Sequence, residues 1–326
     1  MRYNRKANYH SVPFSVNISV TEKCPLKCPM CFQPYDEKAE LDINVICKHL
    51  DELSLMGTKI VQFSGGEPLV YPHLLEAISY AKKQEMRVLI STSGFGLTKE
   101  MAISLKNSGL DCCYVSLNGS KAYIHELVRD RFEDAVKAIE ILPTANIRTL
   151  INWVANHENV RDLSNLVELA KSYDVKGIIL LLNKKSNSGE KLYPLTQEDL
   201  HLLKEQWHKN SDYLGIESCF FQLLNLVKPN SIAKTVGDGC RAGRFHMALS
   251  ARNEFLPCPH VNKPSKTTTS VRDYWNNNIE LRNIRQMLKM NQCFTCNECT
   301  SKGYYAPCYI EISEFNERET CKKRGV

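Results

Sequence analysis

Short apolar runs alternate along the chain with longer segments in which apolar positions recur at helical spacing. The apolar runs predict strands at 14–20, 59–63, 88–92, 112–117, 148–154 and 177–182, and the periodic segments predict helices at 42–56, 71–83, 98–107, 131–142 and 160–172. Thr98 precedes Glu100 in the first turn of the 98–107 helix, Gly109 follows the end of the same helix, and Gly57 follows the end of the 42–56 helix. Strands that alternate with helices predict right-handed crossovers and a parallel sheet.

Units of this kind predict an α/β protein built on a partial, TIM-like (β/α)6 barrel, and reactive groups gather at the carboxyl ends of such strands. The polar run at 184–189 contains Ser and Gly and marks a break after the barrel. We expect an N-terminal extension at 1–13, the barrel at 14–185, a bridging helical segment at 186–239 and a small cysteine-rich domain at 240–326.

Composition narrows the class of protein. Of 326 residues, 43% are hydrophobic and 24% charged, a globular balance. No apolar stretch approaches the ~18 residues of a membrane span, and no apolar segment follows the basic N-terminus as in a signal peptide. The net charge of +6 is spread along the chain and fits an acidic substrate without requiring nucleic acid. We therefore expect a cytoplasmic protein with neither nucleic acid nor a membrane as partner.

Fourteen cysteines are many for such a protein, and a reducing compartment leaves metal binding, catalysis or burial as their roles. Cys24, Cys28 and Cys31 follow the first strand with the spacing C-x3-C-x2-C and no fourth cysteine nearby. Structural zinc sites take four ligands. A [4Fe–4S] cube held by three cysteines instead leaves one iron open for a chelating small molecule.

A second motif stands at the predicted end of the second strand, where the chain reads Gly65, Gly66, Glu67 and Pro68. Together with the cysteines it resembles the radical S-adenosylmethionine (SAM) superfamily. The resemblance implies that Cys24, Cys28 and Cys31 hold a cluster whose open iron chelates SAM, and that the turn contacts the methionine amino group. Its glycines permit close backbone approach. The family cleaves SAM reductively to a 5′-deoxyadenosyl radical, which takes a hydrogen atom from the substrate.

The resemblance implies further SAM contacts near the ends of later strands. They are Ser93 after the third strand, Ser116 at the end of the fourth and Asn152 in the fifth. Met30 occupies the usual aromatic position before the third cysteine, where the family contacts adenine through its backbone. Arg129 matches a recurring family pattern after the fourth strand, with an exposed, solvated arginine as the alternative.

Seven cysteines lie in the last quarter of the chain, and Cys293, Cys296 and Cys299 repeat as C-x2-C-x2-C, which favours iron–sulfur over zinc. The set resembles the SPASM extension of peptide-modifying radical SAM enzymes, which carries two auxiliary [4Fe–4S] clusters and so implies three clusters in all. The implied ligands are Cys240, Cys258 and Cys308 for the nearer cluster, and Cys293, Cys296, Cys299 and Cys321 for the farther one. Two features depart from the family: Asn253 replaces a glycine, and the central spacing differs.

The remaining four cysteines stand outside both groups. Cys47 lies among apolar residues of a helix and is predicted to pack. Counting by twos from Ser116 places Cys112 on the interior face near the barrel floor, and both it and Cys113 are expected to be structural. Cys219 stays open between three roles: core packing, a fourth ligand of the nearer auxiliary cluster, or a hydrogen-atom donor.

The resemblance favours a ribosomal-peptide maturase that crosslinks, epimerises or oxidises its substrate. Only about thirteen residues precede the first strand, so we expect a leader-recognition module to be supplied by a separate protein or not to be needed. A flavodoxin or ferredoxin is the expected reductant. The alternative is a dehydrogenase or epimerase acting on a small molecule such as an aminocyclitol or sugar. A simple electron carrier has no use for the Gly65–Pro68 motif.

Overall fold

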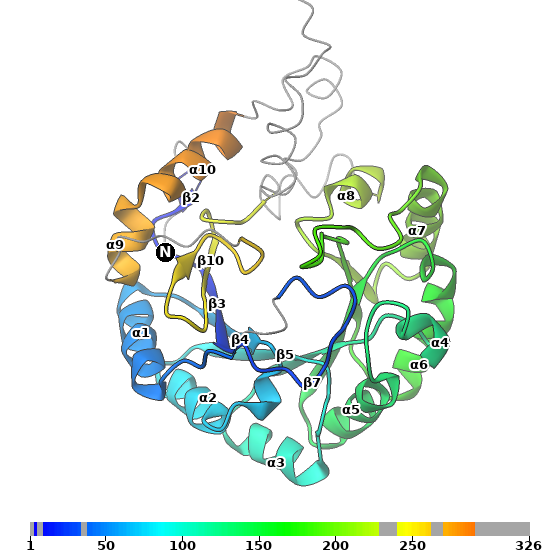
Figure 1. The fold of residues 1–326 in the computed structure, drawn as a ribbon, viewed down its shortest axis with the longest axis horizontal. Coiled ribbons are helices and arrows are strands. Elements are labelled where there is room, and N and C mark those ends of the chain that lie inside the picture. The colour runs from blue at the N-terminus through cyan, green and yellow to red at the C-terminus, as the bar shows by residue number, and fades with distance from the viewer. Residues whose placement is uncertain (1–2, 5–8, 34–37, 228–239, 262–269, 291–326) are drawn as a thin grey trace, which may run out of the picture.

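The computed structural model describes residues 3–4, 9–33, 38–227, 240–261 and 270–290. Its centre is a curved sheet in the order β11-β10-β3-β4-β5-β6-β7-β8-β9, with the strands from β10 through β9 parallel to their neighbours (Figure 1). The six predicted strands are confirmed as β3 (Ser15–Thr21), β4 (Ile60–Gly65), β5 (Arg87–Thr92), β6 (Cys112–Ser116), β7 (Arg148–Val154) and β8 (Ile178–Leu181). This is the parallel α/β sheet of a partial TIM barrel.

The five predicted helices are also present and form an arc outside the sheet (Figure 1). They are α1 (Ile43–Met56), α2 (Leu74–Lys83), α3 (Lys99–Asn107), α5 (Phe132–Thr144) and α6 (Leu163–Ser172). Local sequence sets their ends. Thr98 accepts a hydrogen bond from the Met101 N–H at the start of α3, and Gly57 ends α1 at a φ of 96°. A short helix, α4 (Ala122–His125), and a 3-10 turn, η1 (Pro68–Val70), were not predicted. The first residues of the helix predicted at 160–172 form a second 3-10 turn, η2 (Val160–Asp162).

The two faces of the strands differ in chemistry. On β3, Val16, Ile18 and Val20 point outward and are buried against the helices. Alternate residues point inward and pair with the neighbouring strands: the Ser64 hydroxyl donates to Asn17 Oδ1 at 2.7 Å. The interior is thus lined with hydrogen-bonded polar groups, while the outer face supplies the apolar core.

Cys112 and Cys113 lie on opposite faces of β6, as alternation requires. Cys112 packs with Leu89 and Leu150 in a small apolar cluster inside the barrel, which confirms the predicted interior position. Cys113 belongs to the main core beneath the helices. Both side chains are fully buried, in keeping with structural roles.

Segments beyond residue 185 extend the sheet at both edges. From the segment predicted as a helical bridge, β9 (Leu214–Ile216) pairs with β8, and the same segment supplies α7 (Gln197–Lys209) and α8 (Phe221–Val227). At the other edge β10 (His246–Leu249) pairs with β3. The sequence did not predict β9 or β10 as barrel strands, because strands of three or four residues that are only partly apolar and lack flanking periodicity carry little signal.

A β-hairpin precedes Cys258. Strand β11 (Phe255–Leu256) runs antiparallel to β10 and ends just before Cys258. Asn253, which stands in place of the family glycine, adopts a φ of 61° in the connecting turn. Its Oδ1 atom lies 2.7 Å from Nε2 of His49 on α1, so the turn is also bound to the barrel.

Of two C-terminal helices, α9 (Val271–Asn277) lies beside α1, and α10 (Ile279–Met290) continues from α9 away from it (Figure 1). A small hairpin of β1 (Tyr3–Asn4) and β2 (Tyr9–His10) lies with them, and the Trp275 indole N–H donates to the His10 carbonyl at 3.1 Å. In the part of the chain that the structure describes, no helix is both long and apolar enough to cross a membrane.

We predict that Glu52→Ala loosens α9 from the barrel. Both carboxylate oxygens of Glu52 accept backbone N–H groups at the start of α9, from Val271 and Arg272 at 2.9 Å each. Loss of these charge-assisted bonds at a helix N-terminus should cost about 2 kcal/mol. Hydrogen exchange at Val271 and Arg272 should accelerate in the variant. Glu76→Ala, which removes an exposed carboxylate from α2, is the control; equal exchange in both variants would contradict the prediction.

Candidate active site at the carboxyl ends of the strands

The three N-terminal cysteines lie on the loop that follows β3. The loop is held from below by the segment between β6 and α5: the Lys27 N–H donates to Asp130 Oδ2 at 2.6 Å, and the Asp130 N–H donates to Cys28 Sγ at 3.4 Å. The Met30 N–H donates to the Val128 carbonyl at 3.2 Å. Residues about a hundred positions away therefore determine the shape of the cysteine loop.

The Gly65–Pro68 turn follows β4 and packs directly on the start of the cysteine loop. The Gly66 N–H donates to the Thr21 carbonyl at 2.7 Å, and the Glu67 N–H donates to the Lys23 carbonyl at 3.0 Å. A Cβ atom on Gly65 would lie 2.2 Å from the Thr21 carbonyl oxygen, and one on Gly66 would lie 2.3 Å from that of Lys23. Both glycines are therefore required by the contact between the two motifs.

Glu67 is the buried anchor of this turn. Its carboxylate accepts hydrogen bonds from the Leu69 N–H, the Thr92 hydroxyl, and both the N–H and the hydroxyl of Ser93, at 2.5–3.0 Å. Burial raises the pKa of Glu67, and the bonds from Ser93 and Thr92 oppose that shift. The hydrogen bonds of the Glu67 carboxylate to Thr92 and Ser93 thus join the carboxyl end of β4 to the carboxyl end of β5.

The other predicted SAM-binding residues lie at the same end of the barrel. Ser116 ends β6 and is the register partner of Asn152 on β7. Asn118, just beyond β6, donates from Nδ2 to Met30 Sδ at 3.2 Å and accepts the Val154 N–H at Oδ1. Asn118 thereby joins the cysteine loop to β7. Asn118 lies two residues after Ser116 in the sequence, but only the fold gives it this connecting role.

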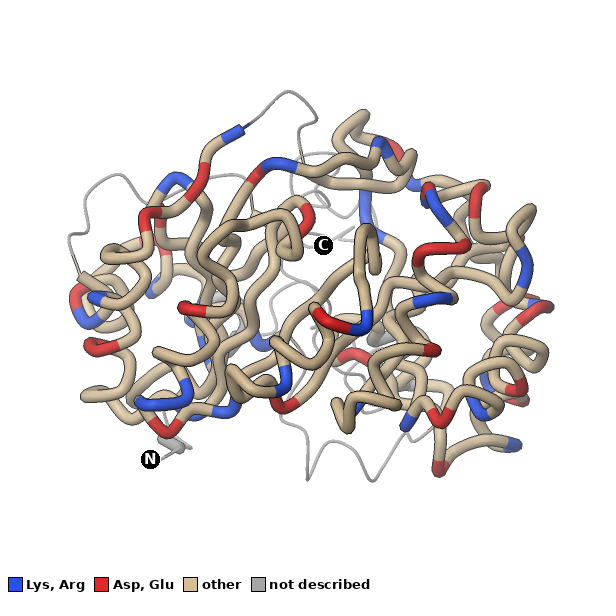
Figure 2. The backbone as a smooth tube through the Cα atoms, turned by 90° about the horizontal axis from the view of Figure 1, so that it is seen from below, with Lys and Arg blue, Asp and Glu red and all other residues tan. Residues whose placement is uncertain are grey.

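Arg129 faces the cysteines. Its Nε atom is buried and has no hydrogen-bond partner among the described residues, and its positive charge opposes the rise that burial causes in the pKa values of Cys28 and Cys31. The alternative of a fully solvated arginine does not describe a half-buried side chain in this position. Elsewhere basic and acidic residues are interspersed along the backbone, so the charge of Arg129 acts locally (Figure 2).

The donor set on this loop fits an iron–sulfur cube. Burial raises the pKa of both Cys28 and Cys31 despite the opposing charge of Arg129, so their thiols require a bound cation to ionise. Within the described residues, no three His, Cys, Asp or Glu side chains are placed to hold a single metal ion. A cube takes each cysteine on a different iron, so its ligands need not converge on one point.

The segment after β8, which the sequence predicts as a domain break, contacts the cysteine loop. The Asn187 N–H donates to the Cys31 carbonyl at 2.8 Å. Beside it, Lys184 Nζ lies 3.2 Å from Glu217 Oε1 and 3.5 Å from His260 Nε2, and the His260 ring packs on Phe32 at 4.2 Å. This polar cluster was not predicted, because its members come from three distant segments.

Among the C-terminal cysteines, Cys240 and Cys258 are described, and their loops meet. Cys240 is buried, and three residues later the Gly243 N–H donates to the Pro257 carbonyl at 3.2 Å, next to Cys258. Cys219 is half-buried against the main core, and its thiol interacts with the guanidinium of Arg241. The other predicted auxiliary ligands, Cys293, Cys296, Cys299, Cys308 and Cys321, lie outside the described residues.

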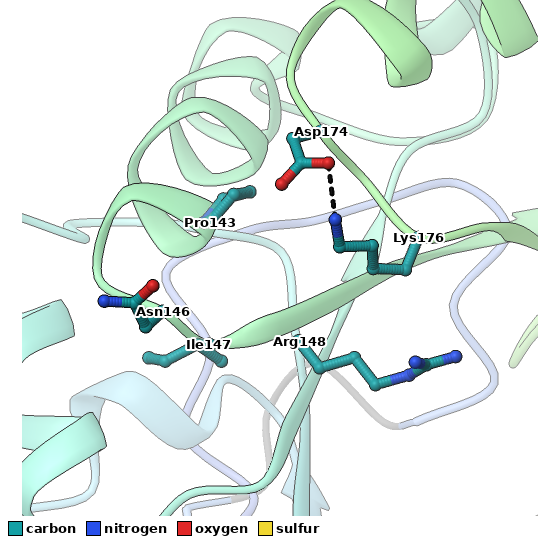
Figure 3. A pocket seen from close by; sticks show the side chains of 6 residues that line it. All are labelled: Pro143, Asn146, Ile147, Arg148, Asp174 and Lys176. Atoms are coloured by element: carbon teal, nitrogen blue, oxygen red, sulfur yellow. Dashed lines mark hydrogen bonds and ion pairs between the residues drawn. The ribbon is translucent and has the colours of Figure 1, made fainter.

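A surface pocket at the opposite end of the barrel has no connection with these residues. It is lined by Pro143, Asn146, Ile147, Arg148, Asp174 and Lys176 (Figure 3). Arg148 begins β7, and Lys176 precedes β8, so the pocket lies at the amino ends of the strands. Active sites of this fold lie at the carboxyl ends, where the cysteines are.

Comparison with known proteins agrees with this fold. Residues 18–170 match the model of the Radical SAM superfamily, a span that contains the cysteine loop, the Gly65–Pro68 turn and the strand-end residues. The chain is therefore a radical SAM enzyme.

Individual relatives have low sequence identity to this chain. The chain is 26% identical to the mycofactocin maturase MftC of Mycolicibacterium smegmatis over 302 residues, 87% of this chain and 75% of the relative. It is 25% identical to the AdoMet-dependent heme synthase of Methanosarcina barkeri over 338 aligned positions, 95% of this chain and 96% of the relative. In fold it is similar to Streptococcus suis SuiB bound to the precursor peptide SuiA, with a TM-score of 0.78 and 18% identity over 95% of this chain and 75% of SuiB.

We predict that Gly66→Ala disrupts the cluster loop, because the added Cβ forces the Lys23 carbonyl away. Reconstituted protein should lose about four iron atoms per chain relative to wild type, as measured by iron analysis. The control is Gly96→Ala, where no atom lies within 4 Å of the added Cβ and only the φ of 70° is unfavourable. Full iron content in Gly66→Ala would refute the prediction.

A second prediction concerns pH. His125 accepts the Asn118 N–H at Nδ1, and burial, aided by the charge of Arg129, lowers its pKa to about 4. Between about 6.5 and 4 the unfolded chain binds a proton that the folded chain does not, so stability falls by up to about 3 kcal/mol as the pH falls through this range. Urea denaturation of the apoprotein measures the slope.

His125→Gln retains a neutral hydrogen-bonding side chain and should flatten this part of the pH profile. Parallel profiles for the wild type and His125→Gln between pH 4 and 6.5 would show that His125 does not carry the effect.

Proposed function

We propose that this radical SAM enzyme abstracts hydrogen from a peptide substrate and matures it by crosslinking, epimerisation or oxidation. The observation that carries the radical chemistry is the hydrogen-bonded contact between the Gly65–Pro68 turn and the start of the cysteine loop. The support for a peptide substrate is the kinship with MftC over most of both chains and the fold shared with SuiB, which binds the precursor peptide SuiA.

In this proposal the residues at the carboxyl ends of the strands divide the work. Cys24, Cys28 and Cys31 hold a [4Fe–4S] cluster, which supplies the electron for reductive cleavage of SAM. The Gly65–Pro68 turn binds the methionine end of SAM, Met30 faces the adenine, and Ser93, Ser116 and Asn152 supply polar contacts. The positive charge of Arg129 partly offsets the cost of ionising the buried Cys28 and Cys31 thiols.

The C-terminal cysteines hold auxiliary clusters in this proposal, which brings the total to three. Cys240, Cys258 and Cys308 bind the nearer one, and Cys293, Cys296, Cys299 and Cys321 the farther one. The contact between the Cys240 and Cys258 loops through Gly243 and Pro257 supports a shared ligand role for this pair. Three roles remain open for Cys219: core packing, a fourth ligand of the nearer auxiliary cluster, or a hydrogen-atom donor. Its packing against the core favours the structural role.

The partners follow from this chemistry. The substrate is a peptide, presented with or without a separate leader-recognition protein, and the electron comes from a reductant such as flavodoxin or ferredoxin. The net charge is only +6, and basic and acidic residues are interspersed along the backbone, so we propose no nucleic-acid partner (Figure 2).

A small-molecule substrate is the second candidate, because the AdoMet-dependent heme synthase aligns with 95% of this chain and is covered over 96% of its own length. A heme precursor then joins aminocyclitols and sugars as the alternatives to a peptide. Its carboxylates would suit the net positive charge of the chain.

Substrate-dependent formation of 5′-deoxyadenosine tests the proposal. Dithionite-reduced, reconstituted protein should release it from SAM, and Cys28→Ala should abolish the release, since no open iron remains to bind SAM. Candidate precursor peptides encoded beside the gene, a heme precursor and an aminocyclitol are then added in turn, and each is examined by mass spectrometry. A mass change only in the heme precursor or the aminocyclitol would refute the peptide assignment while retaining the radical chemistry.

A further inference from the structure

Arg285 on α10 lies where the two described cysteine-bearing loops of the C-terminal segment meet. Its side chain is buried, with 6% of its surface exposed. Its Nε atom donates to the Gly243 carbonyl at 2.7 Å, and its Nη1 atom donates to the Trp275 carbonyl at 2.7 Å. The N–H of the same Gly243 donates to the Pro257 carbonyl, so Arg285 is attached to the junction between the Cys240 and Cys258 loops.

The charge of Arg285 has no counter-ion in the described part of the chain. No carboxylate among those residues forms an ion pair with it, and its Nη2 atom is buried there without a hydrogen-bond partner. The rings of Tyr9 and Trp275 lie 4.1 and 4.6 Å from the guanidinium. Such cation–π contacts contribute about 2 kcal/mol, whereas burial of an unpaired charge costs several.

Burial lowers the pKa of Arg285 to about 10, which leaves the guanidinium protonated at neutral pH. A full positive charge is therefore retained in an apolar surrounding. This is the electrostatic signature of a site completed by an anion.

Tyr274 relates this charge to Cys258. The phenol is buried and interacts electrostatically with both the Cys258 thiol and the Arg285 guanidinium. A second buried arginine, Arg244, donates from Nη1 to the Cys240 carbonyl at 3.3 Å. Two buried arginines thus donate hydrogen bonds to the Cys240 loop, which Gly243 joins to the Cys258 loop. Positive charge next to cysteines favours thiolates and so suits a thiolate-bound, anionic group.

We propose that Arg285 supplies the fixed positive charge that balances an iron–sulfur cluster held by Cys240 and Cys258, and that it raises the reduction potential of that cluster. Thiolate-ligated cubes are anionic, and reduction adds a further negative charge. A nearby buried cation therefore stabilises the reduced form more than the oxidised form, with little screening by solvent. This inference rests on the auxiliary cluster of the proposed function.

The test measures the reduction potential of the auxiliary clusters in full-length protein that carries Cys24→Ala, Cys28→Ala and Cys31→Ala, so that the SAM cluster does not contribute. Redox titrations followed by electron paramagnetic resonance compare this parent with Arg285→Gln and Arg285→Lys. The potential of one cluster should become more negative in Arg285→Gln and stay near the parent value in Arg285→Lys. Arg282→Gln removes an exposed charge one turn earlier on α10 and should leave the potential unchanged.

The outcomes distinguish an effect of the Arg285 charge from an effect of the shape of its side chain. An unchanged potential in Arg285→Gln overturns the inference, and so does loss of iron in both Arg285 variants with the fold retained, because the charge alone would not then suffice. Loss of iron in Arg285→Gln but not in Arg285→Lys supports it. A parent protein without iron refutes the auxiliary cluster itself, whereas iron at an unchanged potential refutes only the role of Arg285.

Should Arg285→Gln fail to fold, Tyr9→Glu and Tyr9→Gln replace it. The glutamate places a carboxylate beside the intact guanidinium and neutralises its charge, while the glutamine is its uncharged match. A more negative potential in Tyr9→Glu than in Tyr9→Gln supports the inference, and equal potentials overturn it.

Discussion

The contact between two backbone segments, Thr21–Lys23 at the end of β3 and Gly65–Glu67 at the end of β4, is the constraint on which the candidate site depends. Two N–H to carbonyl bonds close it, and no side chain larger than hydrogen fits at either glycine. Because Glu67 then binds Thr92 and Ser93, the same contact extends to the end of β5. The cysteine loop thus begins from a position shared by three strands, which limits its freedom before any cofactor binds.

The barrel can hold a polar site because its two faces have separate tasks. The outward residues of the strands bury apolar surface beneath the helices and provide most of the stabilisation. The inward residues are then free to be polar, provided that they hydrogen-bond to one another, as Asn17 does with Ser64 and Gln62 with Ser91. Leu89, Cys112 and Leu150 form a small buried apolar cluster at the floor of the barrel.

Most of the barrel was predictable because its signals are local. Apolar runs and helical periodicity located six strands and five helices, and the spacing of Cys24, Cys28 and Cys31 identified the candidate site. Strands β9 and β10 were not predicted, because they become strands by pairing with the edges of the sheet and not through a sequence pattern of their own. The sequence also did not predict the cluster of Lys184, Glu217 and His260, because each of these residues on its own resembles an ordinary surface residue.

The sequence by itself determined the order of strands and helices, the ligand types and the radical SAM motifs, since each depends on residues close together in the chain. Only the tertiary structure decided which distant groups act on those motifs. It brought Asp130 beneath Cys28, turned the charge of Arg129 toward the thiols, and attached Arg285 to the junction of the Cys240 and Cys258 loops. Burial and the electrostatic environment are sums over neighbours in space, and spacing along the chain does not encode those neighbours.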